Sequence, residues 1–427
     1  MEPEILILAA MMSMIGALAG TFTGIVPGIH VNTLASLMLI LFPVLESIIS
    51  GYTDPTYAPI LVSSFIMSAS VVHSFVDFVP SVFIGAPDPD EVLSVLPGHR
   101  LMMEGKGMVA VRAAAVGSTV GAAMSVLLAI PLQYLMLHGL SDLLDDFTFA
   151  VLLFALCAIV LNEKGFERKI WALTMVLISG GIGYICMMPE LPSNGILGEG
   201  TLLFPLLTGL FGMPALLVST KNTQAPKQKD DRLDPVGPMP GIKGLLMGTI
   251  AGWYPGITST VGASLASIFS PERDPARFIS MVASIGTVTS VFSLITLSVS
   301  GNGRSGTVLV IKEIIGNDLA GFCSPAFVVM LMSVIIAAFF GYYITIASGK
   351  MMISLSSKID SVRMNKVVIV VVSVLVLFLT GPFGIVILFF STLIGLIPVD
   401  LDSNRIPLTG CLIVPVLIFK SSELGLF

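Results

Sequence analysis

Two short stretches in which glycine and proline interrupt an apolar run are the places where this sequence could bind a solute. The first, GTFTGIVPGIHVNTLASL, spans residues 20–37, and the second, GTIAGWYPGITSTVGASL, spans residues 248–265. Proline lacks an amide N–H and clashes with the preceding helical turn, and the glycine after it tolerates the conformations that follow, so each stretch should break a helix. A broken helix at membrane depth exposes backbone groups that can contact a solute.

Polar side chains follow each break and could cap the helix that starts there. An oxygen-bearing side chain at a helix start accepts hydrogen bonds from free N–H groups, and the positive end of the helix attracts anions. We therefore expect an anion site between the two breaks, and a packing kink between closely spaced small residues is the alternative. The polar residues assigned to this site are His30, Asn32 and Thr33 after the first break and Thr258, Ser259 and Thr260 after the second.

A second pair of breaks lies farther along the chain, at FIGAPDPDEV (83–92) and VSGNGRSGTV (299–308). The later stretch fits the pattern G-x-G-x-x-G, but no strand–helix–strand unit surrounds it, so we expect no dinucleotide site. We interpret it as a nest of backbone N–H groups beside a guanidinium that could hold a carboxylate or a phosphate, and a loop charge without a ligand is the alternative. The residues assigned to the nest are Gly301, Asn302, Gly303 and Arg304.

One pair of titratable residues falls within an apolar run. His73 and Asp77 are four residues apart and should share one face of a helix. Ionisable groups inside a membrane are expensive and usually face a cavity or a partner, so this pair is our candidate for coupling to a proton or another cation. A hydrogen-bonded structural pair is the alternative.

The elements that position these residues must be membrane helices. Of the 427 residues, 55% are hydrophobic and 11% are charged, whereas soluble domains carry roughly 25% charged residues. Many of the apolar segments reach the roughly 20 residues that cross a bilayer. The expected segments are 5–26, 31–45, 58–84, 107–138, 147–162, 170–188 and 200–219, then 241–253, 257–270, 278–300, 324–348, 366–382, 384–398 and 407–427.

Composition and motifs also exclude classes of function. The net charge of −6 is spread over short loops and forms no basic stripe, so nucleic acid is not an expected partner. The sequence contains no HExxH, no phosphate-binding GK[ST] loop and no nucleophile elbow, and its four cysteines have no metal-ligand spacing. We therefore expect no enzyme, no metal centre and no organic cofactor.

Each break lies near the start of one of two similar halves of the chain. Residues 221–240 are rich in charge and proline and cannot span lipid, so the predicted parts are a first membrane repeat (1–220), a cytoplasmic linker (221–240) and a second membrane repeat (241–427). Half of the positions in 20–37 are identical in 248–265 without a gap. The matching pairs include Gly24 with Gly252, Pro27 with Pro255 and Gly28 with Gly256.

Loop charges orient the halves. Short cytoplasmic loops carry an excess of Lys and Arg, and the loops at 44–57, 139–146 and 189–199 contain acidic but no basic residues, so we place them outside. The first break then enters from outside and the second from inside. The expected fold is an all-α integral membrane protein with two inverted-topology repeats, each with a re-entrant hairpin broken by glycine and proline and about five transmembrane helices.

With these motifs in hand, the chain resembles the TctA family, the large membrane subunit of tripartite tricarboxylate transporters. Three stretches carry the resemblance: residues 20–43 with the GxxxGxxPG signature, residues 86–118 with a proline-rich loop and a small-residue helix, and LLFPLLTGLFGMPALL at 202–217. This chain departs from the family by Pro87-Asp88 and Gly303-Arg304, where the family has a Pro-Gly dipeptide. The resemblance implies that the substrate site is lined by Gly24, Pro27, Gly28, Gly252, Pro255 and Gly256.

Our first hypothesis is a permease of the plasma membrane that carries an anionic solute, most simply a carboxylate, by alternating access driven by a proton or sodium gradient. The resemblance implies a small membrane subunit and an extracytoplasmic binding protein as partners, and a homo-oligomer is left open. The alternative is a translocase that flips a polyprenyl-phosphate lipid carrier, because a phosphate head would suit the same site while its tail stays among membrane lipids. An intramembrane enzyme is the third and least favoured hypothesis.

Overall fold

The computed structural model of the chain describes residues 3–26, 31–83, 93, 95–188, 190–195, 198–199, 202–219, 226, 228–229, 236–301, 303, 305–356, 361–401 and 403–425. Across these residues the chain is helical, apart from loops and the two-residue strands β1 (Asn194–Gly195) and β2 (Gly198–Glu199), which pair antiparallel. Nine helical spans in this described part are long and apolar enough to cross a membrane. The protein is therefore an all-α, multi-pass integral membrane protein, as its composition predicts.

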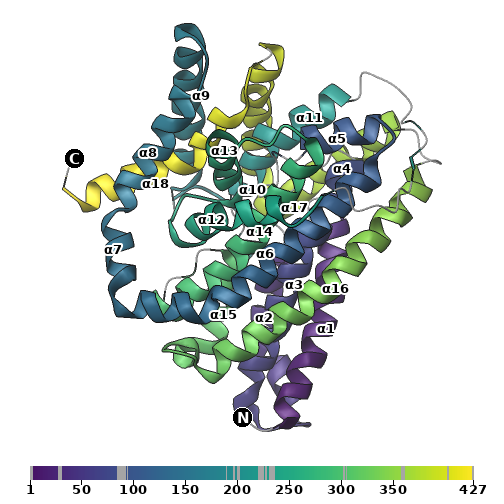
Figure 1. The fold of residues 1–427 in the computed structure, drawn as a ribbon, viewed down its shortest axis with the longest axis vertical. Coiled ribbons are helices and arrows are strands. Elements are labelled where there is room, and N and C mark those ends of the chain that lie inside the picture. Colours follow the sequence, from purple (N-terminus) through teal and green to yellow (C-terminus); the bar gives the residue numbers. More distant parts are fainter. Residues whose placement is uncertain are drawn as a thin grey trace.

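The first half contains two long hairpin helices, a buried helix and one very long helix, followed by shorter elements (Figure 1). Its helices are α1 (Pro3–Ile25), α2 (Val31–Ile49), η1 (Pro55–Tyr57), α3 (Ala58–Val76), α4 (Phe78–Phe83), α5 (Val95–Met103), α6 (Gly107–Leu135), η3 (Met136–Leu140), α7 (Ser141–Asp146), α8 (Thr148–Leu161), α9 (Phe166–Cys186), α10 (Leu203–Leu207), η4 (Thr208–Gly212) and α11 (Met213–Ser219).

The second half follows a similar order. Its helices are α12 (Met239–Trp253), α13 (Ser259–Phe269), α14 (Pro275–Ser300), α15 (Gly306–Ile315), η5 (Gly316–Leu319), α16 (Pro325–Ser356), α17 (Ser361–Asp400), η6 (Ile406–Thr409) and α18 (Gly410–Glu423). The sequence predicts two segments at 366–382 and 384–398, and α17 consists of two helices that meet at a kink at Gly381, whose φ is 71°. The stretch 85–106, to which the sequence assigned no apolar segment, contains α5.

Side chains are distributed as a lipid environment requires. Large apolar side chains point outward: Leu18 and Phe22 of α1 and Val370 of α17 each expose at least 60% of their surface. Hydroxyl-bearing side chains lie inside, and Ser64 of α3 and Ser284 of α14 are fully buried. Lipid tails are as apolar as leucine, so helices in a membrane associate through small residues and interhelical hydrogen bonds.

Glycine stripes bring the hairpin helices close to their neighbours in both halves. A Cβ atom on Gly16, Gly20 or Gly24 of α1 would press on the backbone of α3, and one on Gly244, Gly248 or Gly252 of α12 would press on α14. The nearest carbonyls on α3 belong to Phe65, Ala69 and His73, and those on α14 belong to Met281, Ile285 and Thr289. Each set of carbonyls repeats every four residues, so the hairpins pack in the same register in both halves.

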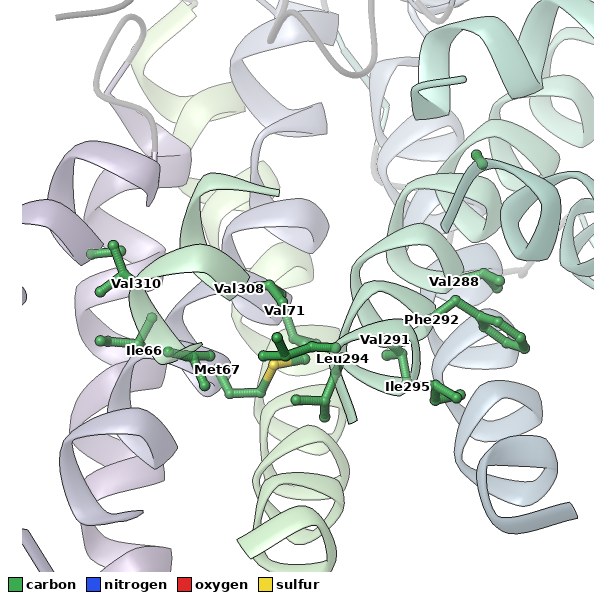
Figure 2. Close-up of a cluster of buried hydrophobic side chains, with 14 of the residues drawn as sticks. Ile66, Met67, Val71, Val288, Val291, Phe292, Leu294, Ile295, Val308 and Val310 are labelled. Carbon is green, nitrogen blue, oxygen red and sulfur yellow. The ribbon is translucent and has the colours of Figure 1, made fainter. Parts of the chain in front are cut away.

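The halves interlock through their longest helices. Helix α3 of the first half packs on α16 of the second, and α14 of the second packs on α6 of the first; Figure 1 shows α6 and α16 running past α3. Figure 2 shows apolar side chains of α3, α14 and α15 pointing toward one another, with Val71 near Leu294 and Val308. The interface between the halves is therefore part of the main core.

A second short sequence motif occurs near the end of each half. LTGLFGMPAL (207–216) and LTGCLIVPVL (408–417) share Leu, Thr, Gly, Pro and Leu at the same offsets. A Cβ on Gly209 would lie 2.8 Å from the Leu388 carbonyl of α17, and one on Gly410 would lie 2.8 Å from the Val176 carbonyl of α9. Each copy thus packs on a helix of the opposite half.

The hairpins differ in length. With a rise of about 1.5 Å per residue, the 23 residues of α1 and the 19 of α2 extend about 34 and 28 Å, comparable with the roughly 30 Å hydrocarbon core. The 15 residues of α12 and the 11 of α13 extend only about 22 and 16 Å. The short helices α12 and α13 are therefore consistent with a re-entrant hairpin, whereas α1 and α2 are each long enough to cross the membrane.

Candidate functional site

The break in the second hairpin has the geometry that its sequence predicts. Helix α12 ends at Trp253, Tyr254 is extended, and Gly256 has a φ of 80°, a left-handed conformation that favours glycine. A Cβ at Gly256 would also lie 2.8 Å from the Val416 side chain of α18. Both the conformation and the close approach require glycine at this turn.

The helix after this break is capped by its own hydroxyl. The Thr258 Oγ1 accepts a hydrogen bond from the Val261 N–H at 3.4 Å and so caps α13. Ser259 and Thr260, in the first turn, are buried. On the α12 side, the Thr296 hydroxyl of α14 donates to the Gly252 carbonyl at 3.0 Å. The α12 arm of this hairpin is thereby held on α14, the buried helix of its own half.

The first break lies between α1, which ends at Ile25, and α2, which begins at Val31. Its central residues, Pro27, Gly28 and His30, lie outside the residues that the structure describes. Gly24 on the preceding turn is buried, and a Cβ there would lie 3.1 Å from the His73 carbonyl and 3.3 Å from the Asp77 amide nitrogen. The structure therefore brings the first glycine motif next to the candidate coupling pair. Thr33 is half-buried in the first turn of α2.

The coupling pair is buried at the end of α3. His73 Nδ1 lies 3.0 Å from the Thr23 Oγ1 of α1, and the His73 side chain is 4% exposed. Asp77, also 4% exposed, directly follows α3, and its N–H donates to the His73 carbonyl at 3.0 Å. The carboxyl group thus lies at the junction between α3 and α4 rather than in the middle of a helix.

The glycine-rich break of the second half joins α14 to α15. Gly301 ends α14 with a φ of 68°, and the Ser305 Oγ caps α15 by accepting from the Val308 N–H at 3.3 Å. Gly303 packs against Leu309. Asn302 and Arg304 lie outside the described residues, so the predicted guanidinium site stays a prediction.

The start of α15 meets the start of α2. The Asn32 Oδ1 accepts a hydrogen bond from the Thr307 N–H at 3.0 Å, and a Cβ on Gly306 would collide with the Asn32 side chain. Asn32 belongs to the first half and Thr307 to the second, so two positively polarised helix ends converge at the interface between the halves.

Comparison with known proteins agrees with these motifs. The model of the tripartite tricarboxylate transporter TctA family matches residues 10–410, nearly the whole chain. The chain belongs to the TctA family. It is also similar to an uncharacterized protein of Methanocaldococcus jannaschii, with 28% identity over 310 residues, which cover 71% of this chain and 72% of that protein. No solved structure matches.

Family membership makes this TctA protein a membrane transporter of a family that works in tripartite systems. The matched region, residues 10–410, includes both glycine–proline breaks, both glycine stripes and the coupling pair.

Sequence reasoning missed a group of hydroxyls between the halves of this TctA protein. Ser70 and Ser74 of α3 face Thr307 of α15 and Thr287 of α14, with oxygen–oxygen distances of 3.4 and 3.5 Å. The only signal in the sequence is the spacing of Ser70, Ser74, Asp77 and Ser81, which places them along one face of a helix. Their partners are more than 200 residues away, so no local pattern could have found the pairs.

Proposed function

We propose that this TctA-family protein is the permease of an anionic solute, most simply a carboxylate, and that it works by alternating access. The observation that carries the proposal is the meeting of α2 and α15 through the Asn32–Thr307 hydrogen bond. Two helix N-termini that converge create a positive potential without a mobile charge, which suits an anion that must be bound and released. Gly24, Asn32, Thr33, Gly301 and Gly303 would line this side of the site.

The second hairpin would close the other side of the solute. Thr258, Ser259 and Thr260 start a short helix whose N-terminus follows the Pro255-Gly256 turn. In this proposal Gly252, Pro255 and Gly256, together with Pro27, Gly28, His30, Asn302 and Arg304, complete the site.

Alternating access needs two units that can move against each other around the solute. We propose that residues 1–220 and 241–427 are inverted repeats joined by the linker 221–240. The matching glycine registers of α1 on α3 and of α12 on α14 support two copies of one packing unit. The reciprocal pairs, α3 with α16 and α14 with α6, support a two-fold relation between the copies.

A gradient would drive the cycle through His73 and Asp77. Both side chains are buried, and the backbone of both residues lies next to Gly24 of the first motif, so a proton or a cation taken up there would be close to the solute. Burial disfavours the charged form of a carboxyl group, so this group could take up a proton or bind a cation in one state of the cycle.

Substitutions at Asn32 test the anion site. The purified protein is unfolded thermally with citrate, other carboxylates and polyprenyl phosphates, because a ligand that prefers the folded state raises the melting temperature. Asn32→Asp keeps an oxygen that accepts from Thr307 but adds a negative charge between the two helix ends, so affinity for the carboxylate should fall at least about tenfold, or about 1.4 kcal/mol. Asn162→Ala, at the end of α8, is the matched control and should bind normally. Unchanged affinity in Asn32→Asp, or no carboxylate that stabilises the wild type, would overturn the proposal.

The inverted arrangement has its own test. Asp142→Cys on α7 and Gly237→Cys in the linker are each introduced with Cys157 and Cys323 replaced by alanine, and intact cells are treated with a membrane-impermeant maleimide. Asp142→Cys should react and Gly237→Cys should react only after the membrane is opened. Labelling of both from the same side would show that the proposed topology is wrong.

A groove on the outer side of the bundle supports a second candidate, the translocation of a polyprenyl-phosphate carrier. It has a volume of about 460 Å³ and lies between α6 and α16, lined by apolar side chains such as Ala122, Val126 and Phe339. A prenyl chain could lie there while its phosphate reaches the helix ends. Stabilisation by polyprenyl phosphate, lost in Ala122→Phe, together with no response to carboxylates, would favour this candidate over the first.

A further inference from the structure

A buried glutamine ties the two halves together at one end of the bundle. Gln133, in the last turn of α6, is fully buried. Its Nε2 donates to the Ser298 Oγ of α14 at 2.9 Å and to the Gly321 carbonyl at 3.2 Å, and its Oε1 accepts from the Cys323 N–H at 3.0 Å. Gln133 belongs to the first half and its three partners to the second. One side chain therefore holds α6 both to α14 and to the loop before α16.

The loop that Gln133 holds has a strained backbone. Gly321 has a φ of 92°, and Cys323, with a φ of 50°, is the one non-glycine residue with a positive φ among the described residues. This left-handed conformation is unfavourable for a residue with a Cβ and persists only where surrounding contacts hold it. The hydrogen bond from the Cys323 N–H to Gln133 is such a contact. Its loss would favour a different conformation of the loop.

The same glutamine contacts the helical turn that leads to the candidate anion site. Ser298 lies three residues before Gly301, where α14 ends. The Ser298 hydroxyl donates to the Ile295 carbonyl at 2.7 Å, so its oxygen is available to accept from Gln133. A movement of the loop away from α6 would therefore change the contacts of the last turn of α14, beside the break.

A second glutamine makes the same kind of contact before α6. The Gln228 Oε1 of the linker accepts from the Gly107 N–H at 2.9 Å, and its Nε2 donates to the Met102 carbonyl at 2.9 Å. The Lys229 N–H donates to the carbonyl of Gly105, whose φ is 77°, at 2.9 Å. In both places an amide side chain accepts from an N–H at or just before the start of a long helix and donates to a carbonyl of the turn that precedes it.

Loop charges assign the two glutamines to opposite faces of the membrane. Gln133 lies six residues before the loop 139–146, which we place outside, and Gln228 lies in the linker, which we place inside. The helices that follow the two held turns are α16 and α6, the reciprocal partners of α3 and α14. One such contact therefore lies toward each mouth of a site between the halves.

We propose that Gln133 is the latch of the outer mouth and Gln228 the latch of the inner mouth, and that the transport cycle opens them one at a time. This inference rests on the proposed alternating access. Both latches are closed in the state described here. An amide suits this role because it donates and accepts at once and carries no charge, so its release leaves no unpaired ion behind.

Reaction of the native Cys323 thiol with a membrane-impermeant maleimide on intact cells tests the outer latch. The Cys323 side chain is half-buried, and Cys157 is replaced by alanine because it is exposed, whereas the other two cysteines are buried. Gln133→Leu removes both donor and acceptor. Each lost hydrogen bond shifts an equilibrium by roughly 2- to 10-fold, so labelling should become at least about tenfold faster.

A milder variant keeps the test usable if Gln133→Leu does not fold. Ser298→Ala removes one acceptor of the latch and should speed the labelling of Cys323 by a smaller factor, of roughly 2- to 10-fold. Ser290 of the same helix bonds the Gly286 carbonyl of its own helix, so Ser290→Ala is the matched control and should label at the wild-type rate.

Gln228→Leu gives a readout that a purely structural role would not change. Release of the inner latch should draw the protein toward the form that is open inward, so Cys323 on the opposite face should label more slowly than in the wild type. A general loosening of the fold would instead make Cys323 label faster.

The proposal is overturned if Gln133→Leu, or Ser298→Ala in its place, labels at the wild-type rate, or if Gln228→Leu does not slow the labelling of Cys323. The thermal melts with carboxylates keep this result separate from the proposed function. Carboxylate binding without the predicted labelling would remove the latches and leave the permease. The predicted labelling without carboxylate binding would leave the latches and remove the proposed substrate.

Discussion

The packing of α1 on α3 makes a quantitative prediction for Gly20→Ala. The new Cβ would collide with the Ala69 carbonyl oxygen and lie 2.9 Å from the Ala69 carbonyl carbon and Cα. These are backbone atoms, so no side chain can rotate away and the helices must separate. Overpacking of a core costs about 1–3 kcal/mol, and a backbone collision belongs at the upper end. Alanine favours a helix by about 1 kcal/mol over glycine, so the net loss of stability should be about 2 kcal/mol.

Gly181 of α9 provides the matched control, because it is also inside a helix but has nothing within 4 Å of its Cβ position. Gly181→Ala should be neutral or stabilise by up to about 1 kcal/mol. Gly248→Ala, the counterpart of Gly20→Ala, meets the Val288 side chain at 2.5 Å and should also destabilise the protein. Unfolding in detergent mixtures, followed by circular dichroism, measures all three. If Gly20→Ala is as stable as Gly181→Ala, the glycine stripe does not set the distance between the helices.

Three further predictions concern the site. Asp77→Asn should abolish gradient-driven accumulation in proteoliposomes while solute exchange continues, because the buried carboxyl group is the candidate coupling group. Full accumulation by this variant would exclude Asp77 as the coupling residue. Arg304→Gln should weaken binding of an anionic solute by about 1–3 kcal/mol, with partial rescue by lysine, and unchanged affinity in calorimetry would reduce Arg304 to a loop charge. Thr258→Val should lower stability by about 0.5–2 kcal/mol through loss of the α13 cap; a thermal melt identical to that of Thr258→Ser would show that the cap is dispensable.

Local chemistry made the breaks predictable from sequence. Pro255 and Gly256 interrupt a helix because of their own covalent structure, and Thr258 caps the next one because of its own hydroxyl, so neighbouring residues suffice to predict both features. The membrane class follows equally from composition, because no other environment accepts so many exposed apolar side chains.

Contacts between distant segments were not predictable in this way. The meeting of Asn32 with Thr307 and of Ser74 with Thr287 depends on how the halves interlock, which no local pattern specifies. Helix α5 was missed because its nine residues include Pro97, Gly98, His99 and Arg100 and form no long apolar run.

The interlocking of the halves also has a consequence for how the chain is made. Helix α3 packs on α16, but about 250 residues must still be synthesised after α3 before α16 exists. At roughly 5–20 residues per second, that interval is about 12–50 seconds. During this time Ser70 and Ser74 of α3 would lie beside the insertion machinery or the early helices without Thr307 and Thr287, their partners from the second half. A nascent chain stalled before residue 325 should therefore be a substrate for membrane quality control, whereas one stalled after residue 356 should resist it.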